Sequence, residues 1–310
     1  MKKIFLIGFW PDYDEMAFKA AISSNVDFVI INFKDKRMLR SLAGIVRTKL
    51  SLSLALSYAI EKLINENGSS AFFFQAHKRI IPLLLKKQWS FTGGIICRDT
   101  VSTRDHLNHY MDRLNKVSIK LWSCDKKDCD RYGMYYYNQF VYMPRQLFAT
   151  RQSVDVLFVG RDKGRDENLN ALARLINNAG KSVLIDLYPS GKFPCPDKPL
   201  LSYSQYLDKV AASSCLIEIL QEGQAGITLR PIEAAVHHKK LITDNPSVVS
   251  ESFYHPNNVL LFDQETSPEM VEVFLAKPFH SLPLTALKPY SAEFVVARMA
   301  EQAWSNVDAG

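Results

Sequence analysis

The stretch VDVLFVGRDKGRDENLNALARLINNAG, residues 154–180, places an apolar run, a basic loop and an amphipathic helix pattern in direct succession. The run from Val154 to Gly160 is short and continuous, which is typical of a strand buried on both faces. Gly180 closes the helix pattern, because glycine readily adopts the backbone conformation that ends a helix. A strand that leads directly into a helix predicts a βαβ unit and a parallel sheet.

The same alternation continues on both sides of this stretch. The expected strands are 2–8, 27–33, 71–76, 94–99, 118–123, 154–160, 182–188, 215–220, 239–245 and 258–263, with an extended aromatic segment at 133–144. The expected helices are 14–24, a long tract at 37–67, 78–88, 104–116, 166–179, 203–214, 228–238 and 291–303. The sequence therefore predicts an α/β protein with two Rossmann-like domains, 1–150 and 151–310, the second carrying the C-terminal helix.

Composition narrows the class of protein. A chain of 310 residues suits two domains of about 150 residues each. The net charge of +6 is scattered, without the block of like charges expected of a nucleic-acid arm. Five irregularly spaced cysteines predict reduced thiols and a cytoplasmic protein, and the apolar run at 2–8 is too short for a signal peptide.

The segment GITLRPIEAA, residues 226–235, has the features of a helix start. Thr228 can cap the helix, Pro231 suits its first turn, and Glu233 favours the helix dipole. Arg230 opposes that dipole unless an anion shares the site. A phosphate held by Thr228 and Arg230 would remove the conflict, with Glu233 accepting hydrogen bonds from a ribose.

The loop after Val159 is the second candidate for anion binding. In a parallel α/β sheet, ligands bind at the carboxyl ends of the strands, and this loop follows a strand directly. Gly160 permits close approach of a ligand, while Arg161, Lys163 and Arg165 supply positive charge. A solvated basic turn is the alternative interpretation.

Together, FVGRDKGR (158–165), YSQYLDKVAASSCLIEI (203–219) and GQAGITLRPIEAAVHHKKLITDN (223–245) resemble the donor domain of GT-B glycosyltransferases, in the order found in bacterial enzymes that build lipopolysaccharide and capsular glycans. The likeness spans about residues 154–262; the first half matches in its strand–helix rhythm and in WSCDKKDCDRYGMYYYNQFVY (122–142). It implies two Rossmann-like domains facing a central cleft. The implied donor-binding residues are Gly160, Arg161, Lys163, Glu218, Gln224, Thr228, Arg230 and Glu233, with Gln221 near the donor sugar or base.

Three departures and alternatives accompany this resemblance. Many retaining members carry two glutamates eight positions apart, but Glu233 counts back to Ala225, so the stereochemistry stays open. His255-Pro256 allows a reading as a sialyltransferase that uses a cytidine monophosphate donor. The triplets Asp12-Tyr13-Asp14 and Asp128-Cys129-Asp130 fit the Asp-x-Asp metal motif, but the first opens a helix and the second lies in a charged loop. We therefore expect no metal and no cofactor besides the donor.

The acceptor base is expected at a strand's carboxyl end in the first domain. Asp12 ranks first, followed by Asp99 and His77. By contrast, His237-His238 is interpreted as a cationic match to the end of a helix.

The predicted function is metal-independent transfer of a sugar from a nucleotide-sugar to a glycan or lipid-linked saccharide acceptor, such as lipopolysaccharide core or capsule. Arg230 and Lys163 would stabilise the phosphate charge. The alternatives are a nucleotide-sugar epimerase of the same fold and a non-catalytic glycan- or nucleotide-binding assembly protein. A basic apolar tract at 37–64 leaves peripheral contact with the inner membrane open, although a pair of core helices is the simpler account.

Overall fold

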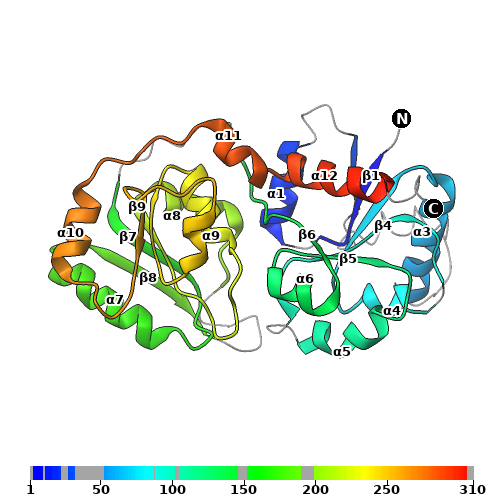
Figure 1. Ribbon diagram of the computed structural model, residues 1–310, viewed down its shortest axis with the longest axis horizontal. Helices are drawn as coiled ribbons and strands as arrows, with labels where there is room; N and C mark the ends of the chain where they lie inside the picture. The colour runs from blue at the N-terminus through cyan, green and yellow to red at the C-terminus, as the bar shows by residue number, and fades with distance from the viewer. Residues whose placement is uncertain are drawn as a thin grey trace. The chain divides into compact units, whose positions relative to one another are not determined.

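The computed structural model describes residues 3–9, 11–21, 27–31, 52–86, 88–101, 105–145, 152–189 and 199–305. Contacts divide the chain into two compact units, Met1–Tyr142 with Ser291–Gly310, and Met143–Tyr290. Each unit contains one parallel sheet flanked by helices (Figure 1). The α/β class, the two Rossmann-like sheets and the C-terminal helix are therefore confirmed.

The first unit has a six-stranded sheet in the order β2-β1-β3-β4-β5-β6. Its strands are β1 (Ile4–Ile7), β2 (Phe28–Ile31), β3 (Ala71–Gln75), β4 (Thr92–Cys97), β5 (Lys120–Ser123) and β6 (Tyr135–Tyr136). Its helices are α1 (Asp12–Ala21), α3 (Leu52–Glu66), α4 (Ile81–Leu84), α5 (Asp105–Leu114), α6 (Lys126–Tyr132) and α12 (Ala292–Ser305).

Alternate residues of the central strands fill the two faces of this sheet. Phe72 and Phe74 belong to one core cluster, which also contains Leu56 and Ile60 of α3. Phe73 belongs to the other, which contains residues of α1 and α12. Because helices cover both faces, the strands are apolar on both sides and have no simple alternation of polar and apolar residues.

The second unit has a five-stranded sheet in the order β11-β10-β9-β7-β8. Its strands are β7 (Val154–Arg161), β8 (Val183–Tyr188), β9 (Ser213–Glu218), β10 (Lys240–Thr243) and β11 (Val259–Leu261). Its helices are α7 (Asp166–Asn178), α8 (Tyr203–Ala211), α9 (Leu229–Val236), η2 (Pro246–Ser250), α10 (Pro268–Ala276), α11 (Leu284–Leu287) and η3 (Lys288–Tyr290). Helices α7 and α10 share one core cluster with the sheet.

The division of the chain differs from the predicted 1–150 and 151–310. The first break falls after Tyr142, and the C-terminal helix belongs to the first unit. Val295, Val296 and Met299 of α12 are buried in the cluster that contains Phe18 of α1, and α12 lies beside α1 (Figure 1). The helix joins the first unit because its apolar face completes that core.

One helix replaces an expected loop, and a second forms where no element was predicted. The segment around Asp128-Cys129-Asp130 forms α6, because the Asp125 side chain accepts backbone hydrogen bonds from Lys127 and Asp128. Helix α10 begins with Ser267 as its cap and Pro268 in its first turn, a signal that the sequence carries in plain view.

Only part of the basic tract at 37–64 falls within the described residues. There, α3 buries Leu56 and Ile60 in the first core, as a core helix should, while the portion at 37–51 lies outside the described ranges. Within those ranges, no helix is both long enough and apolar enough to cross a membrane.

Candidate functional site

The second sheet reverses its strand order between β7 and β9. From β7 the chain moves outward to β8, returns to β9 on the other side of β7, and continues to β10 and β11. The connections that follow β7 and β9 therefore run to opposite sides, and ligands bind at this point in sheets of this kind. We call this place the second switch point.

Arg230 reaches this switch point from the first turn of α9. Its guanidinium donates hydrogen bonds to the carbonyl oxygens of Ile217 in β9, at 3.0 Å, and of Val159 in β7. The carbon of the guanidinium lies 4.7 Å from the centre of the Phe158 ring. The side chain thus joins the two strands on either side of the switch point, and it also interacts with the Tyr206 hydroxyl.

Arg165 brings a second guanidinium to the same place. It donates to the carbonyl oxygens of Ile219, at 2.9 Å, and of Arg161, and it also lies over the Phe158 ring. Burial and the nearby charge of Arg230 lower the pKa of Arg165 to about 10. It remains a cation at neutral pH, but its lowered pKa shows that two positive charges are held close together.

The residues beneath the two guanidiniums explain why they can meet. Phe158 is fully buried and presents its ring to both. A side chain at Gly160 would lie 3.1 Å from that ring and 3.5 Å from the Arg165 guanidinium, so glycine leaves the room that they occupy. Within the described residues, neither guanidinium forms an ion pair with a carboxylate. The charges of Asp162, Glu218 and Asp244 offset part of this positive charge, but none of these carboxylates is paired with either guanidinium, so both cations remain suited to an anion.

Glu218 ends β9 behind this cluster and is 3% exposed. Its carboxylate accepts hydrogen bonds from the hydroxyls of Thr228 and of Thr243, the latter at 2.6 Å. Burial raises its pKa, against the opposing effect of the two hydroxyl donors. Glu218 thus fixes Thr228, which caps α9 by accepting the Arg230 N–H at 3.3 Å.

Glu233 is also buried, at 4% exposure. Its two oxygens accept hydrogen bonds from the hydroxyls of Tyr203, at 2.9 Å, and Tyr206, at 2.7 Å. Burial raises its pKa as well. A ribose would reach this carboxylate only by replacing a tyrosine hydroxyl, and Tyr206 is the less buried of the two. The sequence analysis missed both tyrosines, although YSQYLDK displays them with helical spacing.

The remaining predicted donor residues lie in the two loops. Lys163 adopts a left-handed backbone with φ of 53° and is exposed, as is Arg161. Gln221 and Gln224 are partly exposed in the turn after β9, where the Gln224 N–H donates to the Gln221 carbonyl. Arg165 is held at the switch point by its hydrogen bonds to the carbonyls of Arg161, at the end of β7, and of Ile219, just after β9.

The first sheet has its own switch point, between β1 and β3. Asp12 is exposed at the start of α1, soon after β1, while His77 follows β3 and Asp99 follows β4. The three predicted bases thus share one sheet edge. His77 Nδ1 accepts the Arg79 N–H at 3.2 Å, so a neutral ring carries its proton on Nε2 and has its basic nitrogen engaged.

In each of the two Asp-x-Asp triplets, one aspartate is buried and the other is exposed. Asp14 is completely buried and pairs with Arg98 at 2.6 Å, whereas Asp12 is exposed. Asp128 is buried and accepts the Val101 N–H at 2.8 Å. In the described ranges, no group of three or more histidine, cysteine or acidic side chains is gathered as a metal site would require.

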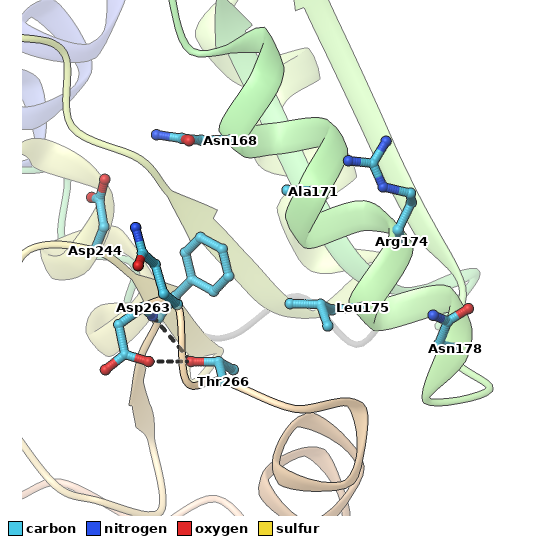
Figure 2. A pocket seen from close by; sticks show the side chains of 10 residues that line it. Asn168, Ala171, Arg174, Leu175, Asn178, Asp244, Asp263 and Thr266 are labelled. Carbon is cyan, nitrogen blue, oxygen red and sulfur yellow. Dashed lines mark hydrogen bonds between the residues drawn. The ribbon is translucent and has the colours of Figure 1, made fainter.

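A cavity of about 680 Å³ lies beside α7 (Figure 2). Asn168, Arg174 and Leu175 line it from the helix, and Asp263 and Thr266 line it from the loop after β11, where the Thr266 hydroxyl donates to Asp263 at 3.0 Å. None of the predicted donor-binding residues lines this cavity.

Two histidine interpretations change. His255 precedes β11, at the amino edge of the sheet, and its ring stacks on His280 at 3.7 Å, far from the edge that carries the arginines. Burial, with the charge of Lys239 second, lowers the pKa of His237 to about 4. His237 is therefore neutral at pH 7. The prediction that it matches the helix end as a cation is wrong for this residue.

The chain is similar to known proteins in its fold and not in its sequence. No protein-family model and no curated protein sequence matches the chain. Among solved structures it is similar to AviGT4, a glycosyltransferase involved in avilamycin A biosynthesis (TM-score 0.58, 10% identity, 100% of this chain and 99% of that one). It is similar to an alpha-glucosyltransferase in complex with UDP and DNA (0.53, 12%, 99% and 95%). It is also similar to UDP-GlcNAc 2-epimerase from Methanocaldococcus jannaschii (0.51, 12%, 100% and 100%). At these identities the likeness establishes the two-unit Rossmann-like fold that these proteins share.

Proposed function

We propose that the protein is a nucleotide-sugar-dependent glycosyltransferase. The observation that carries this proposal is the pair of guanidiniums, Arg165 and Arg230, held by strand carbonyls at the second switch point. A diphosphate has the charge and the oxygen geometry that two adjacent guanidiniums bind. Solved proteins of the same fold include glycosyltransferases, one of them in complex with UDP.

In this proposal, the charge built at the switch point acts on the leaving nucleotide. When the sugar–phosphate bond breaks, negative charge grows on the diphosphate, and Arg165 and Arg230 stabilise it. Lys163 and the backbone at Gly160 and Arg161 lie in the same loop and complete the cradle, and Gln224 faces the donor from the other loop. No metal is required for this stabilisation.

The acceptor base comes from the first unit, with Asp12 ranked ahead of Asp99 and His77. Asp12 is exposed, whereas the basic nitrogen of His77 is already engaged.

The acceptor we propose is a surface glycan or lipid-linked saccharide of the lipopolysaccharide-core or capsule type, on the basis of the sequence resemblance. The enzyme acts in the cytoplasm, with or without contact at the inner face of the membrane.

The central test is thermal stabilisation by UDP-, GDP-, CMP- and ADP-sugars. One of them should raise the melting temperature of the wild type, and Arg230→Ala should weaken its binding by about ten- to a hundredfold. Arg174→Ala is the matched control, because Arg174 is an exposed arginine of the same unit that lines a different cavity. If no nucleotide-sugar stabilises the protein, the proposal fails.

An epimerase is the second candidate, because a UDP-GlcNAc 2-epimerase shares the fold. Incubating the donor without any acceptor separates the two: an epimerised sugar nucleotide identifies the epimerase, and acceptor-dependent release of the nucleotide identifies the transferase. A protein that binds the nucleotide-sugar and shows neither reaction is the non-catalytic assembly protein.

A further inference from the structure

A second basic site lies at the opposite edge of the second sheet. A cavity of about 460 Å³ opens at the amino ends of β7, β9 and β10, where Asp155, Ser213 and Lys240 line it. The strands are parallel, so this edge is the one farthest from Arg165 and Arg230. The remaining basic side chains of the lining are Lys181, His238, Lys239 and Lys277.

Two lysines, Lys239 and Lys240, form the inner wall. Lys239 donates to the carbonyl oxygens of Ala211, at 2.9 Å, and Ser213, at 2.6 Å, while Lys240 donates to three carbonyls at the end of α10. An ammonium has three N–H bonds, so Lys239 retains one that these carbonyls do not use. The carbonyl partners are neutral, and burial lowers the pKa of both lysines.

The outer wall adds two more cations. In the described part of the chain, no hydrogen bond or ion pair engages the side-chain nitrogen of Lys181 or Lys277. Next to them, the His238 ring stacks on Phe279 at 5.3 Å, with its backbone held in the left-handed region at φ of 54°.

The one carboxylate of the lining, Asp155, interacts with the charge of Lys181 and offsets only part of the positive charge. Asp155 accepts two hydrogen bonds from Ser182, both at 2.8 Å, and one from Gln152 at 3.0 Å, so its oxygens are committed to the start of β8. Four lysines thus face one carboxylate in a single cavity. Lys240 is buried, Lys181 and Lys239 are half-buried and Lys277 is exposed, and an anion would stabilise this excess of positive charge.

We propose that this cavity binds a phosphate group, with Lys181, Lys239 and Lys277 as its ligands. The volume exceeds that of a bare ion, so the phosphate belongs to a larger molecule, either a soluble phosphomonoester or a lipid headgroup. This site is independent of the switch point and of the proposed transferase activity.

The test uses the full chain with Arg230→Ala as background, so that phosphate bound at the switch point contributes less to the signal. Inorganic phosphate is titrated calorimetrically at constant ionic strength. Adding Lys181→Gln with Lys277→Gln should weaken its binding by about tenfold or more. The control adds Lys116→Gln with Lys127→Gln, two exposed lysines of the first unit, and should leave binding unchanged.

Equal phosphate affinity of the two triple variants, or no binding in the Arg230→Ala background protein, overturns the proposal. Both lysine pairs are at or near the surface, so the substitutions should leave the fold intact. A cooperative thermal unfolding transition in a chloride buffer without phosphate checks that each variant is folded. Cosedimentation with phosphatidylglycerol vesicles, compared with phosphatidylcholine vesicles, then assigns the source. Vesicle binding that Lys181→Gln with Lys277→Gln abolishes identifies a lipid headgroup, and phosphate binding without vesicle binding identifies a soluble ligand.

Discussion

Each of the two sheets carries arginine at its carboxyl edge, and the surroundings of the charge differ. In the first unit, Arg98 is buried at 3% side-chain exposure and pairs with the Asp14 carboxylate at 2.6 Å, while Gln139 accepts another of its hydrogen bonds. In the second unit, Arg165 and Arg230 donate to backbone carbonyls. A guanidinium paired with a carboxylate has no net charge to offer, whereas one held by carbonyls does. The first arrangement fixes helix α1 to the sheet, and the second prepares a site for an anion.

The largest expected effect tests the structural half of this comparison. Asp14→Ala leaves the buried Arg98 charge without its carboxylate and should lower the free energy of unfolding by about 3–5 kcal/mol. Urea denaturation at pH 8 measures it, because burial raises the pKa of Asp14 to about 6 against the charge of Arg98, and the carboxylate is ionised at pH 8. Glu15→Ala, which breaks the exposed Lys19–Glu15 pair on the same helix, should cost about 1 kcal/mol or less.

A second test concerns His237, a buried side chain of the second unit that is neutral at pH 7 because burial lowers its pKa. Burial lowers the pKa of His237 in the folded protein to about 4, whereas the ordinary pKa of a histidine is 6.5, so between these values the unfolded chain binds more protons. Its contribution to stability is complete above about pH 6.5 and is lost as the pH falls toward 4, to a total of about 3 kcal/mol.

His237→Phe should remove that part of the pH dependence. The phenyl ring has a similar size, and Nε2 of His237 is buried without a hydrogen-bond partner in the described structure, so stability at pH 7 should not fall. Denaturation curves at pH 4.5, 5.5 and 7 for wild type and variant give the difference directly. Parallel pH profiles for the two proteins would contradict the assignment.

The functional half of the comparison is tested by Arg230→Lys. Lysine keeps the positive charge but cannot donate to Ile217 and Val159 while presenting a planar face to a phosphate. Nucleotide affinity should therefore fall by about tenfold, between wild type and Arg230→Ala, or about 1.4 kcal/mol. Equal affinity of Arg230→Lys and wild type would show that charge alone suffices at the switch point.

The smallest effect concerns the cap of α9. Thr228→Ala removes the hydroxyl that accepts the Arg230 N–H and donates to Glu218, and should cost about 1 kcal/mol of unfolding free energy. Thr228→Ser keeps the hydroxyl and serves as the control. A loss in Thr228→Ser equal to that in Thr228→Ala would mean that the methyl group, not the hydrogen bonds, holds the helix start.

Helices and strands were predicted correctly from the sequence where the pattern that signals them is local. Val154 to Gly160 predicted β7 because a buried parallel strand needs a short apolar run, and Thr228 predicted the start of α9 because a cap needs a hydroxyl beside free N–H groups. It also identified Arg230 as a cation out of place at a helix start. The missed helices, α6 and α10, carried equally local caps at Asp125 and Ser267.

Local sequence patterns did not predict which side chains bind the buried charged groups. No local pattern indicates that Asp14 pairs with Arg98, 84 positions away, or that the hydroxyls of Tyr203 and Tyr206 donate to the oxygens of Glu233. For the same reason Arg165, grouped with its basic neighbours by sequence, proved to be the one that the strand carbonyls hold at the switch point.

The sequence by itself determined two series of buried strands and helices, and the loops in which an anion site had to lie, because hydrophobic periodicity and helix capping depend on residues near one another in the chain. Only the tertiary structure decided that α12 completes the first core, that Asp14 neutralises Arg98, and that Arg165 and Arg230 share one edge with no carboxylate paired to either in the described ranges. Those outcomes depend on the order of strands in each sheet, which brings distant side chains together and settles whether a buried charge meets its opposite or is left for a ligand.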